Sequence, residues 1–237
     1  MAEKNSTELA ARCKTTFLGI FVAIWDGLKY LATEPLKWGL CQWVVAIIFI
    51  SSVVLAYIWK RPIQCFFRGN DAGFGETIAD IGKYGGDFPM PLAIGFLLSI
   101  GGCIANRKIW LDTGVALLAA AGLAGILTPI GQFILYESRP HQGGELIFFH
   151  LGGHGISGHA TASALLLWPI MHILFKEAKK ILRTVAYILL IGWPCLVGWS
   201  RMWDDKHYLW NVMLGLAVGF SSSYAVVKSR EKQGCAT

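Results

Sequence analysis

The sequence Ile-Ser-Gly-His-Ala at residues 156–160 is the stretch around which the rest of the chain is organised. It opens a long apolar run and lies between two other groups of polar residues in an otherwise hydrophobic sequence. The three groups contain Ser138, Arg139 and Pro140, then Ser157, Gly158 and His159, then Ser200, Arg201 and His207. Because each group stands at an end of an apolar run, we predict that they meet at one end of a helical bundle.

The composition is that of an integral membrane protein. Hydrophobic residues make up 54% of the 237 positions, charged residues only 15%, and the mean hydropathy is +0.51. Such a chain is too apolar for an ordinary soluble domain. We expect one compact domain with about five to seven membrane-spanning helices, because each span needs about 20 predominantly apolar residues.

The net charge of +6 could indicate a nucleic-acid ligand, but many of the basic residues lie beside apolar runs. Basic residues in that position set the orientation in the membrane and contact anionic lipid headgroups. We therefore expect the lipid bilayer as a partner and no nucleic acid. The six cysteines include no C-x-x-C pair, which argues against a disulfide framework and against a zinc site.

The apolar pattern predicts an all-α, polytopic membrane helical bundle with six transmembrane helices. The predicted spans are residues 39–59, 89–105, 109–136, 157–175, 181–199 and 208–227. They form one domain of residues 38–228, followed by a cytoplasmic tail of residues 229–237. The polar stretch 63–88 is expected to be a loop with one short helix near residues 75–84. On the last span, Gly215 and Gly219 form a small-xxx-small pattern, which permits close helix packing.

Residues 1–37 are expected to form a cytoplasmic, interfacial segment. A helix over residues 7–33 would carry its apolar side chains on one face, and charged residues interrupt any continuous span. The apolar side chains are Phe17, Ile20, Phe21, Ile24, Leu28 and Leu31. This pattern is typical of an amphipathic helix at the membrane surface, with a poor first transmembrane helix as the alternative. Pro35 is expected to end the helix.

Basic residues are unevenly divided between the two sides of the predicted bundle. The side with both termini and the turns 106–108 and 176–180 holds 14 of the 21 lysines and arginines. The positive-inside rule places that side in the cytoplasm. Both termini are then cytoplasmic, and the three polar groups face outward.

Two arginines and two histidines at one membrane face suit phosphoryl transfer. The guanidinium groups of Arg139 and Arg201 can neutralise phosphate oxygens by bidentate hydrogen bonds. Backbone N–H groups around Ser157 and Gly158, at the start of a predicted helix, form an anion site. Of the two histidines, one can attack phosphorus and the other can protonate the departing oxygen.

The order R-P, S-G-H and S-R-x5-H, found within residues 132–211, resembles the three-part signature of the type 2 phosphatidic acid phosphatase superfamily. This superfamily includes lipid phosphate phosphatases, bacterial phosphatidylglycerophosphate, undecaprenyl-diphosphate and lipid A phosphatases, glucose-6-phosphatases and vanadium haloperoxidases. The resemblance implies that His207 is the nucleophile, which forms a phosphohistidine, and that His159 protonates the leaving group and then activates water. It implies neither a metal nor a cofactor. The phosphate-binding residues that it implies are Arg139, Ser157, Gly158 and Arg201.

The chain departs from this signature at three positions. Gln132 replaces the lysine that usually precedes the arginine of R-P by seven residues, and Ile156 replaces a proline in the second group. Asn211 replaces an aspartate that would orient the nucleophilic histidine; an asparagine can accept a hydrogen bond from the ring but supplies no charge. We predict that Gln132 binds phosphate and that Asn211 is catalytic. Asp204 and Asp205 could supply the missing charge or form a solvated turn.

Two further sets of residues admit both a structural and a functional interpretation. His150 and His154 could bind a metal or touch a phosphate, although loop histidines are more often plain polar residues. Four aromatic residues around the third group are typical of the membrane interface, and could instead line an opening for the acyl chains of a lipid. They are Trp199, Trp203, Tyr208 and Trp210.

These inferences together predict a multi-pass enzyme of the bacterial inner membrane with a periplasmic active site. We expect a metal-independent lipid phosphate phosphatase acting on phosphatidylglycerophosphate, undecaprenyl diphosphate, phosphatidic acid or a lipid A phosphate. A lipid phosphotransferase with a polyprenyl diphosphate donor is one alternative, because an acceptor hydroxyl could resolve the same phosphohistidine. A catalytically weak member that binds or transports phospholipids is another, because Gln132 and Asn211 carry no charge. The sequence leaves open the lipid, the role of residues 63–88 and the oligomeric state.

Overall fold

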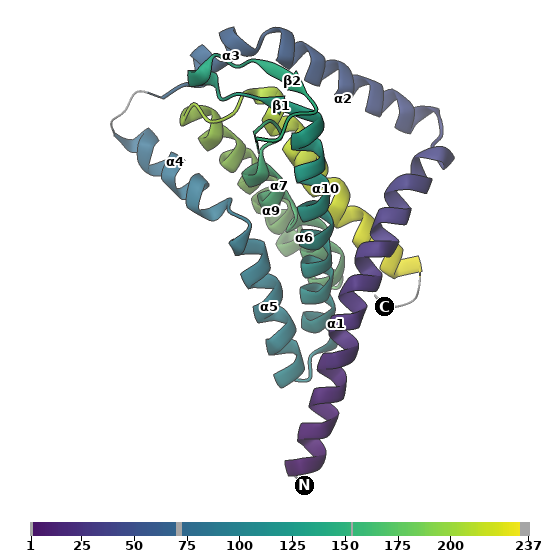
Figure 1. Cartoon of the computed structure of the whole chain (residues 1–237). Coiled ribbons are helices and arrows are strands. Elements are labelled where there is room, and N and C mark those ends of the chain that lie inside the picture. Colours follow the sequence, from purple (N-terminus) through teal and green to yellow (C-terminus); the bar gives the residue numbers. More distant parts are fainter. Residues whose placement is uncertain (1, 70–72, 153, 233–237) are drawn as a thin grey trace.

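The chain folds around a bundle of long helices, with a small hairpin at one end (Figure 1). The computed structural model describes residues 2–69, 73–152 and 154–232. Within these residues, all regular structure except two three-residue strands is helical. The prediction of a helical protein is therefore confirmed, with the hairpin as an addition.

The hairpin divides the chain into two halves. The first half contains α1 (Ala2–Thr33), η1 (Glu34–Lys37), α2 (Leu40–Ile58), α3 (Lys60–Phe67), α4 (Phe74–Gly85), α5 (Pro89–Ile104) and α6 (Lys108–Ile134). The second half contains β1 (Leu135–Glu137), η2 (Pro140–Gln142), β2 (Leu146–Phe148), α7 (Gly158–Ala164), α8 (Leu167–Pro169), the π-helix η3 (Ile170–Leu174), α9 (Lys180–Trp203) and α10 (Leu209–Lys232).

The N-terminal helices wrap around the bundle. α1 ends just before Pro35, as predicted, and packs along α6 and α10. α2 crosses the upper right of Figure 1 and leads to α3 beside the hairpin. The sequence did not predict α3, because Lys-Arg-Pro at residues 60–62 indicates the end of a helix. Proline is nevertheless tolerated in the first turn of a new helix, where Pro62 lies.

α1 is apolar on two sides over its second half. Ile20, Ile24 and Leu28 pack against the core. Phe21, predicted on the same face, is instead 70% exposed, and Trp25 is exposed beside it. The bundle therefore covers only part of the apolar surface of this helix, and the predicted amphipathic helix is not confirmed. The interfacial position of α1 stays a prediction.

α4 packs against α9 and meets α5 at a bend of 54°. It forms where a short helix was predicted near residues 75–84. The contact with α9 is close, since a Cβ at Gly82 would lie 2.8 Å from the Cβ of Ser200. Glycine is needed at this position because no larger side chain fits. The contact fixes the bend between α4 and α5 near the end of α9.

Between α6 and α7 the chain forms an antiparallel hairpin, in which Leu135 pairs with Phe148 and Glu137 with Leu146. The all-α prediction places no strand between the predicted spans 109–136 and 157–175, so it missed the hairpin. Strands of three residues are too short for an alternating pattern to be recognised in the sequence. The hairpin carries Arg139 in its turn and holds that turn at the end of the bundle.

The predicted fourth span is a broken helix inside the bundle. α7, α8 and η3 together run from Gly158 to Leu174. Pro169 has no N–H to donate within the helix, and the next turn widens so that the Phe175 N–H donates to the Ile170 carbonyl. At 1.5 Å per residue this segment is about 25 Å long, less than the roughly 30 Å of a hydrocarbon core.

Four helices among the described residues are long and apolar enough to cross a membrane, namely α2, α6, α9 and α10. The bent pair of α4 and α5 would make a fifth. The predicted number of six spans is therefore not confirmed, because the fourth predicted span is short and broken. Only 6% of the apolar segment of α2 is buried by the rest of the chain, and such a surface indicates a membrane protein.

α10 packs against α7 through the two glycines of the small-xxx-small pattern. A Cβ at Gly215 would collide with the carbonyl oxygen of Ser157, and one at Gly219 with that of Thr161. The predicted close packing is therefore confirmed. It fixes the start of α7 against the first turns of α10, and so brings two of the three polar groups together.

Candidate active site

The three polar groups of the sequence meet at the end of the bundle that carries the hairpin. The Ser157 N–H donates to the Asn211 carbonyl at 3.1 Å, which joins the start of α7 to the first turn of α10. The His207 N–H donates to the Arg201 carbonyl at 3.3 Å, which folds the connection between α9 and α10 back onto the end of α9. Backbone hydrogen bonds thus hold the second and third groups in one place.

His207 lies at the centre of a cluster of basic groups. Its side chain is half-buried, and its pKa is lowered to about 3 by burial and by the charges of Arg201, His159 and Arg139. A hydrogen bond with the backbone of Gly155 acts in the opposite direction. The ring is therefore neutral near pH 7, and a neutral imidazole has one nitrogen with a lone pair that can act as a base or nucleophile.

Arg201 is buried at the end of α9, with 4% of its surface exposed. Its guanidinium group is paired with the carboxylate of Asp204 in the next turn. Asp205 points elsewhere: it accepts a hydrogen bond from the Gln64 amide at 2.8 Å and lies 3.8 Å from Arg68. Asp204 therefore balances the charge of Arg201, while Asp205 ties α3 to this turn. Residues 204 and 205 therefore form ion pairs and a hydrogen bond, and not the solvated turn that was one of the two alternatives.

His159 faces a carboxylate that the sequence did not single out. Its Nε2 lies 3.3 Å from Oδ1 of Asp87, at the bend between α4 and α5. Burial and the charge of Arg201 lower the pKa of His159, and the negative charge of Asp87 opposes that shift. The only signal in the sequence was an acidic residue in the polar stretch 63–88. The packing of α4 on α9 is what brings Asp87 to the site.

The start of α7 is suited to binding an anion. Ser157 is fully buried, and its hydroxyl accepts the Ala160 N–H at 3.4 Å as the N-cap. The backbone N–H of Ser157 donates to the Asn211 carbonyl on α10, and phosphate binding by Ser157 stays a prediction. The N–H groups of Gly158 and His159 belong to the first turn and have no partners inside the helix. A Cβ on Gly158 would meet only Phe88 among the described residues, at 3.9 Å, so the space in front of this turn is open.

Gln132 and Asn211, which replace two charged residues of the signature, both form hydrogen bonds with the backbone of the site. Gln132 donates from Nε2 to the Ile156 carbonyl at 2.9 Å, next to Ser157. Oδ1 of Asn211 accepts the Tyr208 N–H at 3.0 Å, next to His207. Phosphate binding by Gln132 and a catalytic role of Asn211 stay predictions.

Several other residues, for which the sequence allows a structural or a functional role, pack against other parts of the chain. The rings of His150 and His154 lie 4.4 Å and 6.0 Å from that of Tyr136. The indole of Trp203 lies against α4, where a Cβ at Gly75 would collide with it. Tyr208 and Trp210 are 3% exposed, so they belong to the core and neither to an aromatic belt nor to an opening for lipid.

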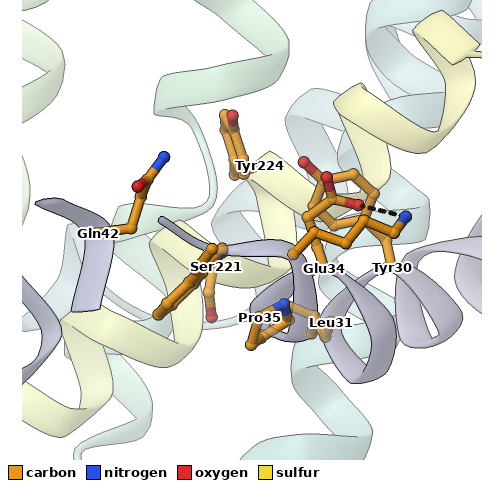
Figure 2. A pocket seen from close by; sticks show the side chains of 9 residues that line it. Tyr30, Leu31, Glu34, Pro35, Gln42, Ser221 and Tyr224 are labelled. Carbon is orange, nitrogen blue, oxygen red and sulfur yellow. Dashed lines mark hydrogen bonds and ion pairs between the residues drawn. The ribbon is translucent and has the colours of Figure 1, made fainter. Parts of the chain in front are cut away.

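A pocket of about 380 Å³ lies away from these residues, where the end of α1 and η1 meet α10 (Figure 2). Tyr30, Glu34 and Tyr224 line it, and no predicted site residue does. An apolar cavity of about 410 Å³ between α1, α5 and α6 is lined by Phe88 and Leu92 among others. Since Phe88 is the neighbour of Gly158, this second cavity approaches the site from the apolar side of the bundle.

A family model described as the PAP2 superfamily matches residues 113–235. Comparisons with curated proteins and with solved structures gave no match. The matched segment covers more than half of the chain, includes α7 to α10, and contains all eight residues assigned to the site from the sequence. Members of this superfamily are generally phosphatases that act on phosphate esters, often those of lipids. The chain belongs to the PAP2 superfamily.

Proposed function

We propose that the protein is a membrane phosphatase that removes a phosphate from a lipid on the periplasmic leaflet, through a phosphohistidine and without a metal. The observation that carries this proposal is the cluster of Arg139, His159 and Arg201 around a neutral His207. A neutral imidazole has the lone pair that nucleophilic attack on phosphorus requires. Two guanidinium groups beside it stabilise the charge that develops on the transferring phosphoryl group.

The residues can share the two steps of such a reaction. The free ring nitrogen of His207 attacks phosphorus, and the bond from phosphorus to the lipid oxygen breaks. His159 gives its proton to that oxygen, so the lipid leaves as an alcohol or, from a diphosphate, as a monophosphate. His159 then takes a proton from water, which attacks the phosphohistidine and releases inorganic phosphate. Asp87 favours the protonated form of His159 that the first step needs.

A lipid substrate is supported by the apolar cavity that reaches Phe88. A phosphate held at Gly158 would have its apolar part on the side of this cavity, between α1, α5 and α6. Apolar side chains there can bury an acyl or prenyl chain at about 25 cal/mol per Å² of surface removed from water. A small soluble phosphate ester would gain nothing from such a surface.

The test is phosphate release by purified protein in detergent from phosphatidylglycerophosphate, phosphatidic acid, undecaprenyl diphosphate and a lipid A phosphate. We expect release from at least one of them, and a loss of about a thousandfold or more in His207→Asn. His172→Asn, at the opposite end of the bundle, is the matched control and should keep its activity. Unchanged release by His207→Asn would refute the mechanism.

The same assay separates hydrolysis from phosphoryl transfer. With a labelled terminal phosphate on the substrate, a phosphatase puts the label into inorganic phosphate. A phosphotransferase puts it into a second lipid, because an acceptor hydroxyl replaces water in the second step. Label recovered mainly in lipid would favour the phosphotransferase over the phosphatase.

A further inference from the structure

Glu137, at the end of β1, is a buried carboxylate beside the site that the proposed mechanism does not use. Its side chain has no exposed surface, and Nζ of Lys60 lies 2.6 Å from Oε1. The same ammonium group donates to the Gly144 carbonyl at 2.6 Å. Lys60, the first residue of α3, therefore connects this helix to the hairpin. Among the described residues, it supplies the one positive charge in contact with the Glu137 carboxylate.

Two donors on α10, the amide of Asn211 and the indole of Trp210, act on the Glu137 carboxylate. Oε2 of Glu137, Nδ2 of Asn211 and Nε1 of Trp210 are all buried, and none has a partner of ordinary hydrogen-bond geometry among the described residues. Burial raises the pKa of Glu137, while Lys60, Asn211 and Trp210 act on it as donors and lower it. The amide and the indole are thus close enough to stabilise the carboxylate without reaching an ideal contact.

Asn211 is the residue through which this cluster reaches the reacting groups. It is the third residue of α10, and its Oδ1 accepts the N–H of Tyr208, which immediately precedes the helix. In a capping box, the side chain of the third helical residue accepts the backbone N–H of the N-cap residue and so fixes the backbone at the start of the helix. Here Tyr208 is the N-cap residue, and His207 is the residue directly before it. The backbone carbonyl of Asn211 also holds the Ser157 N–H.

An amide can be turned by 180° at little cost unless its two ends have different partners. Here the capping contact needs the oxygen toward Tyr208, and this orientation leaves the nitrogen toward Glu137. A carboxylate at 137 therefore selects the amide orientation that caps α10. We propose that Glu137 is a positioning residue, whose charge fixes the Asn211 side chain and, through it, the place of His207. The expected effect on catalysis rests on the proposed function, whereas the pairing of Glu137 with Asn211 does not.

The cluster also explains why an amide suits position 211. An aspartate there would place a second carboxylate next to Glu137 with Lys60 as the shared counter-charge, and like charges that close cannot both ionise at ordinary cost. Glu137 and Asn211 are therefore a matched pair. A lone Asn211→Asp change is expected to lower activity, so its failure to raise turnover would not by itself indicate a binding protein.

The experiment is a double-mutant cycle of Glu137→Gln, Asn211→Asp and the two together, in the full-length protein in detergent. We expect each single change to lower kcat about ten- to hundredfold with KM changed much less, because the phosphate-binding arginines are untouched. The double variant restores a single carboxylate facing an amide, so we expect it to recover to within a few-fold of wild type. Glu145→Gln, an exposed residue of the same hairpin, is the matched control and should behave as wild type.

A pH profile separates positioning from general damage to the fold. The titratable groups around the pair are Lys60, Tyr57 and Tyr208. In Asn211→Asp the two carboxylates repel each other while both are ionised, and the pair takes up one proton as the pH falls, so kcat should recover toward acid pH. That acid recovery should be absent from the double variant. A merely destabilised protein would show no such recovery.

The thermal midpoint of each variant gives a readout that does not depend on activity. We expect the two changes to be coupled in the thermal midpoint as well. The decrease in the double variant should be smaller than the sum of the decreases in the two single variants. Purely additive losses in both midpoint and kcat would overturn the inference. If wild type releases no phosphate while the midpoints are coupled, the proposed function fails and the pairing of Glu137 with Asn211 stands.

Discussion

His207 has a pKa far below the ordinary value of a histidine, and this has a consequence for folding as well as for catalysis. The pKa falls from 6.5 to about 3 because burial and three neighbouring cations disfavour the charged ring. The folded protein therefore holds His207 neutral over a range of pH in which the unfolded chain would protonate it.

We predict that stability falls as the pH is lowered from about 6.5 toward 3, because the unfolded state binds a proton at His207 that the folded state excludes. The contribution of His207 is fully present above pH 6.5. The measurement is the thermal midpoint in detergent between pH 4 and pH 7.5. His207→Asn should flatten this dependence, whereas the exposed His150 changed to Asn should not; equal slopes in all three proteins would contradict the prediction.

Asp87 should tune the acid that protonates the leaving group. Its negative charge raises the pKa of His159 against burial and Arg201. In Asp87→Asn the pKa should fall, so the alkaline limb of the kcat profile should move to lower pH. Asp80→Asn, on the exposed side of α4, serves as control. An alkaline limb that stays in place would show that Asp87 does not act on the general acid.

At this scale the sequence predicts the residues that carry the chemistry but not every group that contacts them. Arg139, His159, Arg201 and His207 could be named because their order along the chain is distinctive. Asp87 could not, because nothing local to it distinguishes it from other acidic residues of the stretch 63–88. Its role depends on a contact between α4 and α9, which no spacing in the sequence encodes.

At the scale of elements, the contact of α7 with α10 decides how the site is assembled. A side chain at Gly215 would meet the backbone of Ser157, which cannot move aside as a flexible side chain would. Gly192 on α9, by contrast, has open space around it. The two glycines thus form a matched pair for testing the packing.

We predict that Gly215→Ala destabilises the protein by about 1–3 kcal/mol, the usual cost of overpacking a close contact, and lowers phosphate release by displacing Ser157. Gly192→Ala should leave both quantities near wild type. Thermal unfolding in detergent and the phosphate assay measure them. Equal midpoints for the two variants would show that α7 and α10 are not held by this contact.

The sequence predicted most helices well and failed on the irregular ones. Long apolar runs predicted α2, α5, α6, α9 and α10 within a few residues of their ends. The hairpin was missed because its strands are too short to show a period, and α3 because Pro62 indicates the end of a helix. The break at Pro169 was missed because burial inside the bundle, and not a continuous hydrogen-bond ladder, holds that segment.

At the scale of the whole molecule, ion pairs mark the end of the bundle opposite the site. Arg230 on α10 lies 3.3 Å from Asp112 near the start of α6, and Lys232 lies 3.0 Å from Glu34 at the start of η1. The site lies at the other end of α6 and α10. α6 has 27 residues, so the two ends are about 40 Å apart at 1.5 Å per residue.

We predict that the site end faces away from the cytoplasm, because the opposite end carries most of the basic residues. Single cysteines at Glu145 in the hairpin and at Lys179 before α9, in a chain without its native cysteines, test this. A membrane-impermeant maleimide should label position 145 in intact cells and position 179 only after permeabilisation. The reverse pattern would overturn the predicted orientation of the whole protein.

The sequence by itself determined that the chain is helical and apolar, and which family signature it carries, because hydrophobic runs and the order of polar groups are properties of the chain alone. Tertiary structure decided which groups meet. It paired Asp87 with His159 and Asp204 with Arg201, turned Asn211 into a cap at the start of α10, and joined the Ser157 N–H to the Asn211 carbonyl. These are contacts between segments distant in the chain, and they arise only when helices pack closely enough for one backbone to touch another.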